Sequence, residues 1–235
     1  MMMYRQAFAI ALRAVCASVL SLATILPALA APIADTSGNV AVRDSRGRSQ
    51  PPAWVAFRRA WADIVGYSAT VRIFEKKGAQ VQHVVFEYNF RKPSSATVHV
   101  VQGPNAGVTL VWNGGSTMAA HRGSGFFAQF KRTVSLHDPL ATTIRGSSID
   151  QLSFGAILTH AQQTPGAVSQ SRGPLIGGVA TEAVKLIPTP SVSDAGLTHE
   201  VVDISEKTHF PMRVLGYDGG TLVRRIDFSN VKLER

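Results

Sequence analysis

Two short stretches of the chain hold residue types that perform nucleophilic or acid–base chemistry. His137 precedes an Asp-Pro pair, and a carboxylate beside an imidazole can orient it as a general base. However, Asp138 followed by proline is also a common turn sequence. Ser124 lies between two glycines, but its neighbours do not form the strand-to-helix elbow of a serine hydrolase. The sequence predicts no catalytic residue, and a hydrolase with a dispersed site is only a rival hypothesis.

Metal and cofactor binding are not predicted either. No two of the seven histidines have the short spacing of metal ligands, and the single cysteine, Cys16, lies far from all of them. No glycine-rich phosphate loop precedes a helix, and no pair of carboxylates is placed on facing strands. We therefore expect no cofactor, no metal and no nucleic acid as a ligand. The histidines are His83, His99, His121, His137, His160, His199 and His209.

The first thirty residues have the order of a secretory signal peptide. Arg5 and Arg13 precede an apolar run over 14–26, and a small-x-small motif ends at Ala30. This run is shorter than the roughly 20 residues of a membrane-spanning helix. Residues 1–30 are therefore predicted to direct export to the periplasm and to be removed from the mature protein. Since Cys16 lies in this segment without a lipoprotein cleavage site around it, we expect no lipid anchor and no disulfide.

The chain is basic, with a formal net charge of +9. An exported protein without an aromatic-basic module is an improbable nucleic-acid binder, so anionic membrane surfaces or acidic proteins are the better candidate partners. A generally basic surface that keeps the protein soluble is the alternative.

The elements that would position a site are strands with few helices. Residues 31–50 are polar and predict a flexible tail, and 51–235 predict a single domain. A helix begins at Pro51-Pro52 and ends at Gly66, and a second one runs over Ile149–Gln162 with Ser148 and Gln151 as a capping box. Alternating patterns predict strands within 67–78, 80–93, 96–103, 107–115, 116–123, 177–188 and 197–205, and a closing two-stranded ribbon within 208–235.

The aromatic and aliphatic side chains of these elements exceed what two helices and one sheet need for a core. An ordinary core is one interpretation; the other is an apolar cavity for a lipid-like ligand. The cavity is predicted to be lined by Trp54, Phe57, Trp61, Val71, Ile73, Val84, Phe86, Tyr88, Phe90, Val98, Val100, Leu110, Trp112, Phe154 and Leu158.

A loop in the middle of the chain is the second candidate site. Its phenylalanines are flanked by basic residues, which predicts a mobile lip that contacts membrane phosphates; burial of the loop on the sheet is the alternative. The lip residues are Arg122, Phe126, Phe127, Phe130, Lys131 and Arg132. In the closing ribbon, Arg213, Arg224 and Arg225 are expected to stay in water as a basic rim.

Three stretches resemble the LolA-like family of periplasmic lipoprotein carriers: Phe90–Pro93, Val100–Gly115 and the ending 203–233. The resemblance covers about 52–235. It implies an α+β fold, a curved antiparallel sheet of about 9–11 strands that forms a half-open β-barrel, with two to three helices covering the concave face. In that family a sheet arginine ties the helices shut, and Arg72 or Arg91 are the candidates.

The resemblance also implies a function. The protein would be a soluble periplasmic carrier, or a chaperone in outer-membrane biogenesis, that binds a lipid or a lipoprotein acyl chain. It would be a monomer with transient membrane contact and with transfer partners at the inner and outer membranes. The alternative is an envelope sensor or scaffold that uses the same fold to bind a protein partner.

Overall fold

The computed structural model describes residues 50–123, 131–189 and 196–235. All of them lie in the larger of the chain's two compact units, Val40–Arg235, whereas the smaller unit, Met1–Asn39, falls outside the described residues. The predicted signal peptide, and the predicted tail apart from Gln50, are also outside this part and stay predictions.

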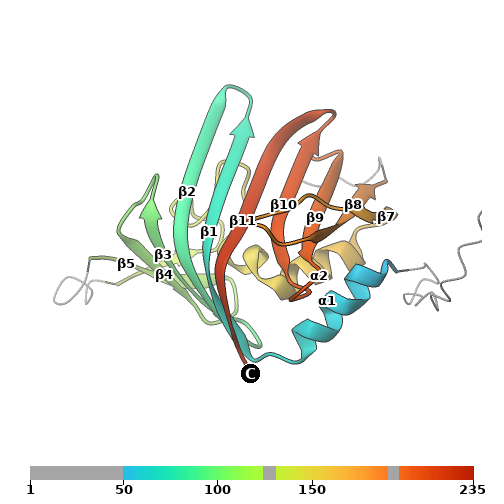
Figure 1. The fold of residues 1–235 in the computed structure, drawn as a ribbon. Helices are drawn as coiled ribbons and strands as arrows, with labels where there is room; N and C mark the ends of the chain where they lie inside the picture. Colours follow the sequence, from blue (N-terminus) through green and yellow to red (C-terminus); the bar gives the residue numbers. More distant parts are fainter. Residues whose placement is uncertain (1–49, 124–130, 190–195) are drawn as a thin grey trace, which may run out of the picture. The chain divides into compact units, whose positions relative to one another are not determined.

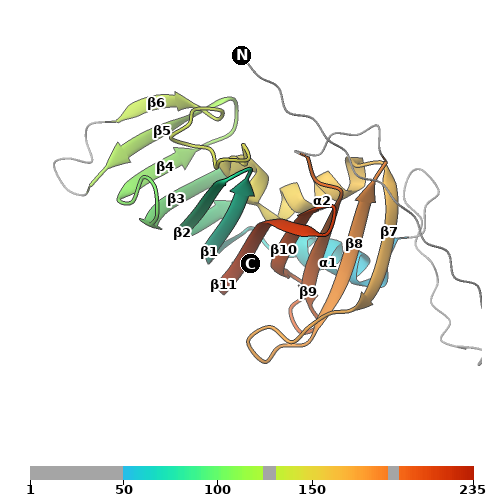
Figure 2. The same ribbon diagram turned by 90° about the horizontal axis from the view of Figure 1, so that it is seen from above.

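Within the described residues, eleven strands form one antiparallel sheet with the order β6-β5-β4-β3-β2-β1-β11-β10-β9-β8-β7 (Figures 1 and 2). Strands that follow one another along the chain pair with each other, except β6 and β7 at the two edges. The first strand pairs with the last, which joins the two halves of the sheet. The strands are β1 Gly66–Lys77, β2 Gln80–Arg91, β3 Ser95–Gln102, β4 Val108–Trp112, β5 Thr117–Arg122, β6 Arg132–Ser135, β7 Gly166–Arg172, β8 Thr181–Pro188, β9 His199–Ser205, β10 Pro211–Asp218 and β11 Thr221–Glu234.

The antiparallel sheet confirms the predicted sheet type, but two of its strands were not predicted. β6 and β7 are the edge strands, and each pairs with one neighbour only among the described residues. Their sequences, RTVS and GAVSQSR, are short and polar. An edge strand pairs on one side only and is often short and polar. Hydrophobic alternation along the sequence therefore does not identify it.

Three short helical segments accompany the sheet in the described part of the chain: α1 Pro52–Ala62, the 3-10 helix η2 Ile149–Leu152, and α2 Phe154–Gln163. The single helix expected over Ile149–Gln162 is therefore wrong, since the chain is extended at Ser153. The Ser153 hydroxyl accepts a hydrogen bond from the Ala156 N–H and caps α2, which makes a break here favourable. In η2 the Gln151 side chain accepts from the Ser148 N–H at 3.3 Å, as the capping box predicts.

All three helical segments pack on one face of the sheet. Alternate residues of β1 and β2 are buried there, whereas the residues between them are more exposed. The Phe154 ring of α2 stacks on Tyr67 of β1, with ring centroids 4.1 Å apart, and meets Phe228 of β11 at 5.1 Å. Phe57 of α1 contacts the same Phe154 ring at 6.2 Å. We call this side the covered face (Figure 1).

Two tyrosines of the covered face hold the helical segments on the sheet. The Tyr88 hydroxyl donates to the carbonyl of Ile149 at 3.2 Å, and the Tyr67 hydroxyl accepts from the N–H of Phe154 at 3.2 Å. Burial raises the pKa of Tyr67 and of Tyr88 well above the ordinary value of a phenol, and the neighbouring charges of Tyr88 and of Asp150, respectively, raise them further.

This burial predicts a loss of stability at alkaline pH. Above about pH 10 the phenols ionise in the unfolded chain but not in the folded one. The stabilisation is complete below that pH and is lost as pH rises, by up to about 1.4 kcal/mol per pH unit for each tyrosine. We expect Tyr88→Phe to flatten the dependence of the unfolding free energy on pH between 9 and 11, measured by urea denaturation. Parallel curves for the variant and the wild type would contradict this account.

Candidate ligand-binding site

A cavity of about 320 Å³ lies on the covered face, between the η2–α2 segment and strands β8 to β11. This volume is at the lower end of the range of about 300–1,000 Å³ for small-molecule sites. Its apolar wall consists of Leu152, Ala156, Ile157, Leu186, Val202, Val214, Ile226 and Phe228. Its polar wall consists of Arg145, Gly146, Ser147, Gln151, His160, Glu200 and Arg224.

The polar wall is built by the register of the sheet. Arg224 of β11 pairs with Gly216 of β10, and Gly216 pairs with Glu200 of β9, so the three residues form one row across the strands. Gly216 has no side chain, and a Cβ there would lie 3.2 Å from the Cβ of Arg224. The guanidinium of Arg224 therefore reaches across β10 to Glu200. On the other side, the row continues to Glu75 of β1.

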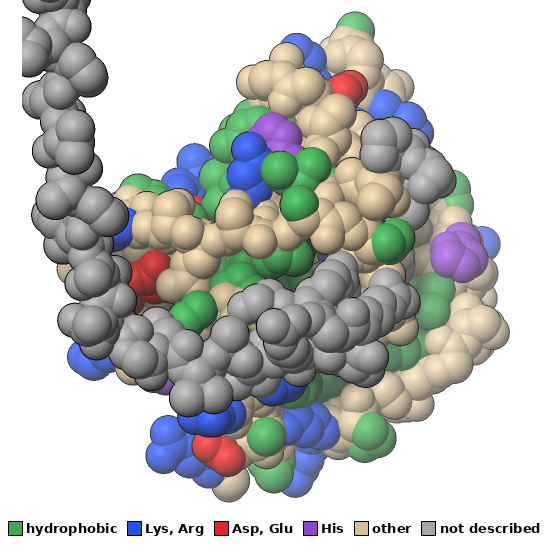
Figure 3. All heavy atoms as spheres, turned by 90° about the vertical axis from the view of Figure 1, so that its right-hand side faces the viewer, with side chains coloured by type: hydrophobic (Ala, Val, Ile, Leu, Met, Phe, Trp, Pro, Cys, Tyr) green, Lys and Arg blue, Asp and Glu red, His purple; other side chains and the backbone are tan. Residues whose placement is uncertain are grey.

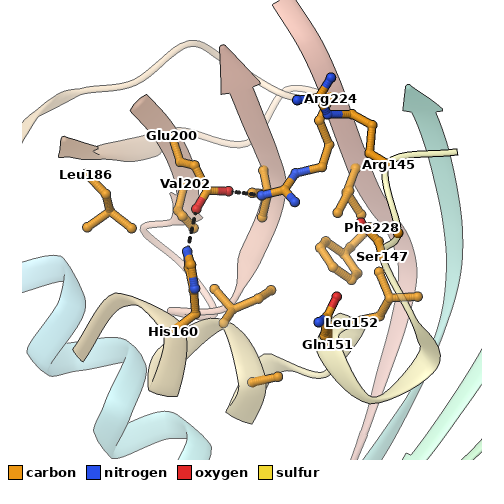
Figure 4. A pocket seen from close by; sticks show the side chains of 15 residues that line it. Arg145, Ser147, Gln151, Leu152, His160, Leu186, Glu200, Val202, Arg224 and Phe228 are labelled. Atoms are coloured by element: carbon orange, nitrogen blue, oxygen red, sulfur yellow. Dashed lines mark hydrogen bonds and ion pairs between the residues drawn. The ribbon is translucent and has the colours of Figure 1, made fainter. Parts of the chain in front are cut away.

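Glu200 is the centre of a three-residue contact (Figure 4). Its side chain is 4% exposed, and one carboxylate oxygen pairs with the guanidinium of Arg224. The other oxygen lies 2.8 Å from the Nε2 of His160, which comes from α2 rather than from the sheet. Both oxygens of this buried carboxylate thus have a cationic or hydrogen-bonding partner, as a buried charge requires.

Glu75, at the other end of the row, is completely buried and binds a loop rather than the cavity. Its carboxylate accepts from the Arg145 N–H at 2.9 Å and from the Ser147 hydroxyl at 3.1 Å. The Arg145 side chain in turn donates to the carbonyl of Lys76 at 2.8 Å. These bonds attach the loop before η2 to β1 and place Arg145 and Ser147 on the cavity wall.

The cavity wall contains an imidazole–carboxylate pair, His160 and Glu200, and a hydroxyl side chain, Ser147. An imidazole held by a carboxylate is the pair used in general-base catalysis, but a nucleophile must lie within its reach. Ser147 supplies the hydroxyl side chain of the described cavity wall, and it donates to Glu75 instead. The described residues contain no group of three or more His, Cys, Asp or Glu side chains that could hold a metal ion.

The predicted cavity residues all lie on the covered face, and all except the half-buried Trp61 are buried. None of them lines the 320 Å³ cavity. A second cavity of about 60 Å³ lies over β1 to β4 and is also lined by residues of the segment 140–152. Six of the predicted residues line it: Ile73, Val84, Phe86, Val98, Val100 and Leu110. Their role in binding a ligand stays a prediction.

The first helix meets the sheet differently from the expectation that its aromatic stripe faces the aromatic row of β2. Trp61 does reach that row, with its ring 5.7 Å from Phe90. Phe57 instead contacts Phe154 and Phe210, and Trp54 packs against Phe57. The reason is that α1 also extends toward the other edge of the sheet, where Ala53 donates its N–H to Gln170 of β7 at 3.0 Å.

The predicted lip lies mostly outside the described residues, including Phe126, Phe127 and Phe130. The flanking Arg122 at the end of β5, Lys131 and Arg132 are described, and all three are exposed. The membrane contact of this loop stays a prediction.

Two of the three ribbon arginines do not stay in water, which corrects the expectation of a basic rim. The side chain of Arg224 is 14% exposed and lines the cavity. Arg213 is 19% exposed and pairs with the buried Asp203 at 2.7 Å. Burial raises the pKa of Asp203, and the hydrogen bond from Arg213 opposes this rise. The prediction was wrong because Arg213 has a carboxylate partner on the neighbouring strand β9, and Arg224 has one two strands away, also on β9.

Arg72 and Arg91, the candidates for the sheet arginine that ties the helices shut, point away from the helices. Arg72 and Arg91 are exposed at positions that alternate with the buried residues of β1 and β2. Arg72 donates to the hydroxyl of Ser229 at 3.0 Å on that side.

Figure 3 shows the molecule from the β7 side, where hydrophobic side chains are visible in a hollow and Lys and Arg are more frequent than Asp and Glu.

The sequence analysis missed Glu200, Arg224 and His160 as site residues. A usable signal was present in β9, where Glu200 is in phase with Val202 and Ile204, so a carboxylate had to share the buried face with them.

No helix of the described part of the chain is long and apolar enough to cross a membrane.

The fold and the cavity define a curved-sheet protein with a ligand-sized pocket under its helices. No protein-family model matches the chain, and no curated protein matches it. Among solved structures, it is similar to the lipoprotein LppX from Mycobacterium tuberculosis, with 16% identity, 78% of this chain and 96% of that chain covered, and a TM-score of 0.44.

Two further structures are similar to it. A LolA superfamily protein from Nitrosomonas europaea has 10% identity over 79% of this chain and 95% of that chain, with a TM-score of 0.35. MucB from Pseudomonas aeruginosa, in complex with MucA, has 13% identity over 79% of this chain and 58% of that chain, with a TM-score of 0.40. A member of the LolA superfamily, the family that the sequence resembles, is thus among the similar structures.

Proposed function

We propose that the protein is a periplasmic carrier or binding protein for a lipid or lipoprotein acyl chain, held on the concave side of the sheet beneath α2. The observation that carries the proposal is the 320 Å³ cavity, because eight apolar side chains from η2, α2 and four strands converge on it. An empty apolar cavity costs stability, and a ligand that fills it stabilises the folded form by mass action.

The cavity has one apolar and one polar wall, which suits an amphiphile better than a plain hydrocarbon. We propose that the chain of the ligand lies against Val202, Val214 and Ile226, with its polar end toward Arg224 and Glu200. The signal peptide over 1–30 would deliver the protein to the periplasm, and the exposed Arg122 and Arg132 would lie toward anionic membrane phosphates during transfer.

The test is binding of a fluorescent fatty-acyl probe to delipidated protein. We expect the probe to bind and to raise the melting temperature, and we expect Ala156→Phe to weaken binding at least about tenfold, because the larger side chain fills the cavity. The matched control is Ala167→Phe at an exposed position of β7, which should bind as the wild type does. If the probe binds neither the wild type nor the control, the carrier function is wrong.

A second candidate is a sensor or scaffold that binds a protein partner. The observation that favours it is the pair of unpaired edges in the described sheet, at β6 and β7. An unpaired edge can accept a strand from another chain. This candidate replaces the first if the acyl probe does not bind.

A further inference from the structure

We infer that the polar wall of the cavity recognises an oxyanion, a carboxylate or a phosphate, as the head group of the bound chain. The inference deepens the proposed function and rests on it. It assigns the site to Arg224, which faces the cavity from the sheet together with Glu200 (Figure 4).

The first observation is that both oxygens of each carboxylate in the row already have a donor as partner. Glu200 uses one oxygen for Arg224 and the other for His160. Glu75 lies behind the wall, where its two oxygens accept from the Arg145 N–H and the Ser147 hydroxyl. A cationic head group would have to share a buried carboxylate with the donors that already bind it.

The second observation is a surplus of donors. Arg224 donates to Glu200, but its buried Nε has no hydrogen-bond partner among the described residues. A guanidinium has five N–H donors in a planar fork that matches two oxygens of a carboxylate or phosphate. The amide of Gln151, whose oxygen accepts from the Ser148 N–H, has its NH₂ group available at the exposed rim.

The third observation is the charge of the wall itself. Two guanidinium groups, Arg145 and Arg224, line the cavity, and Glu200 is the one carboxylate among its described lining residues. An oxyanion bound beside Arg224 would lie next to a guanidinium group. A buried donor without a partner costs free energy, and an oxyanion placed here would remove that cost.

The protein surface next to the polar wall is apolar, which favours a lipid over a free anion as the ligand. Val214, Ile226 and Phe228 continue from the row of Arg224 along the same two strands. A free phosphate would leave this surface uncovered, whereas the alkyl chain of a fatty acid or of a lipid phosphate would cover it.

The experiment compares ligands with one chain and four head groups: dodecanoate, dodecyl phosphate, dodecanol and dodecylamine. Each displaces the fluorescent acyl probe from delipidated wild-type protein. We expect dodecanoate and dodecyl phosphate to bind at least about tenfold more tightly than dodecanol, and dodecylamine most weakly. In the neutral double variant Arg224→Gln with Glu200→Gln, the preference for dodecanoate over dodecanol should disappear.

The matched control is Arg213→Gln with Asp203→Asn, which neutralises a buried ion pair between the neighbouring strands β9 and β10 but outside the cavity. This variant should keep the preference. Equal affinities for dodecanoate and dodecanol in the wild type, or tighter binding of dodecylamine, would overturn the inference while leaving the carrier function intact. Displacement by none of the four would overturn both. Competition by inorganic phosphate alone would keep the oxyanion site and identify its source as a free anion.

Discussion

Replacing Phe154 with alanine is expected to lower the free energy of unfolding by about 3–5 kcal/mol, one of the two largest losses that we predict for a single substitution. The ring is completely buried at the start of α2. It stacks on Tyr67 and Phe210, at centroid distances of 4.1 and 5.2 Å, and meets Phe57 and Phe228 edge-on. Its removal leaves a void where α1, α2 and the sheet meet. Urea denaturation of purified protein measures the change.

The control for this prediction is Phe74→Ala on β1, at the half-buried position on the other side of the sheet. Phe74 makes a ring contact with His83 at 5.3 Å. Since less apolar surface is buried there, we expect less than half of the loss at Phe154. Similar losses for the two variants would show that α2 does not depend on Phe154 for its attachment.

The second large effect is expected for Arg224→Leu, at about 3–5 kcal/mol. The substitution keeps most of the side-chain volume but leaves the buried carboxylate of Glu200 with His160 as its remaining described partner. A buried charge that has lost its partner keeps the unfavourable free energy of desolvation but no longer has the favourable attraction of the ion pair. Thermal and urea denaturation would measure the loss.

The same reasoning predicts rescue by a second substitution. Adding Glu200→Gln to Arg224→Leu removes the unpaired charge, so the double variant should regain most of the lost stability, to within about 1 kcal/mol of the wild type. If the two losses simply add, the pair does not interact, and the row across β9 to β11 does not act as an ion pair in solution.

The sequence by itself determined the sheet and most of its strands. Alternation in β2 identified the buried residues Val84, Phe86, Tyr88 and Phe90 because a strand with one covered face must bury every second side chain. The Ser148–Gln151 pair marked the start of η2 because helix N–H groups need local acceptors. These features depend on neighbours within a few residues along the chain.

The tertiary structure alone decided where the cavity lies and what lines it. Arg224, Glu200 and His160 are separated along the chain by 24 and 40 residues, and only strand register and the position of α2 bring them together. An arginine in a strand has the same local pattern whether it points to water or to a buried carboxylate. The difference lies in the register of β9, β10 and β11, which is set by pairings between distant residues.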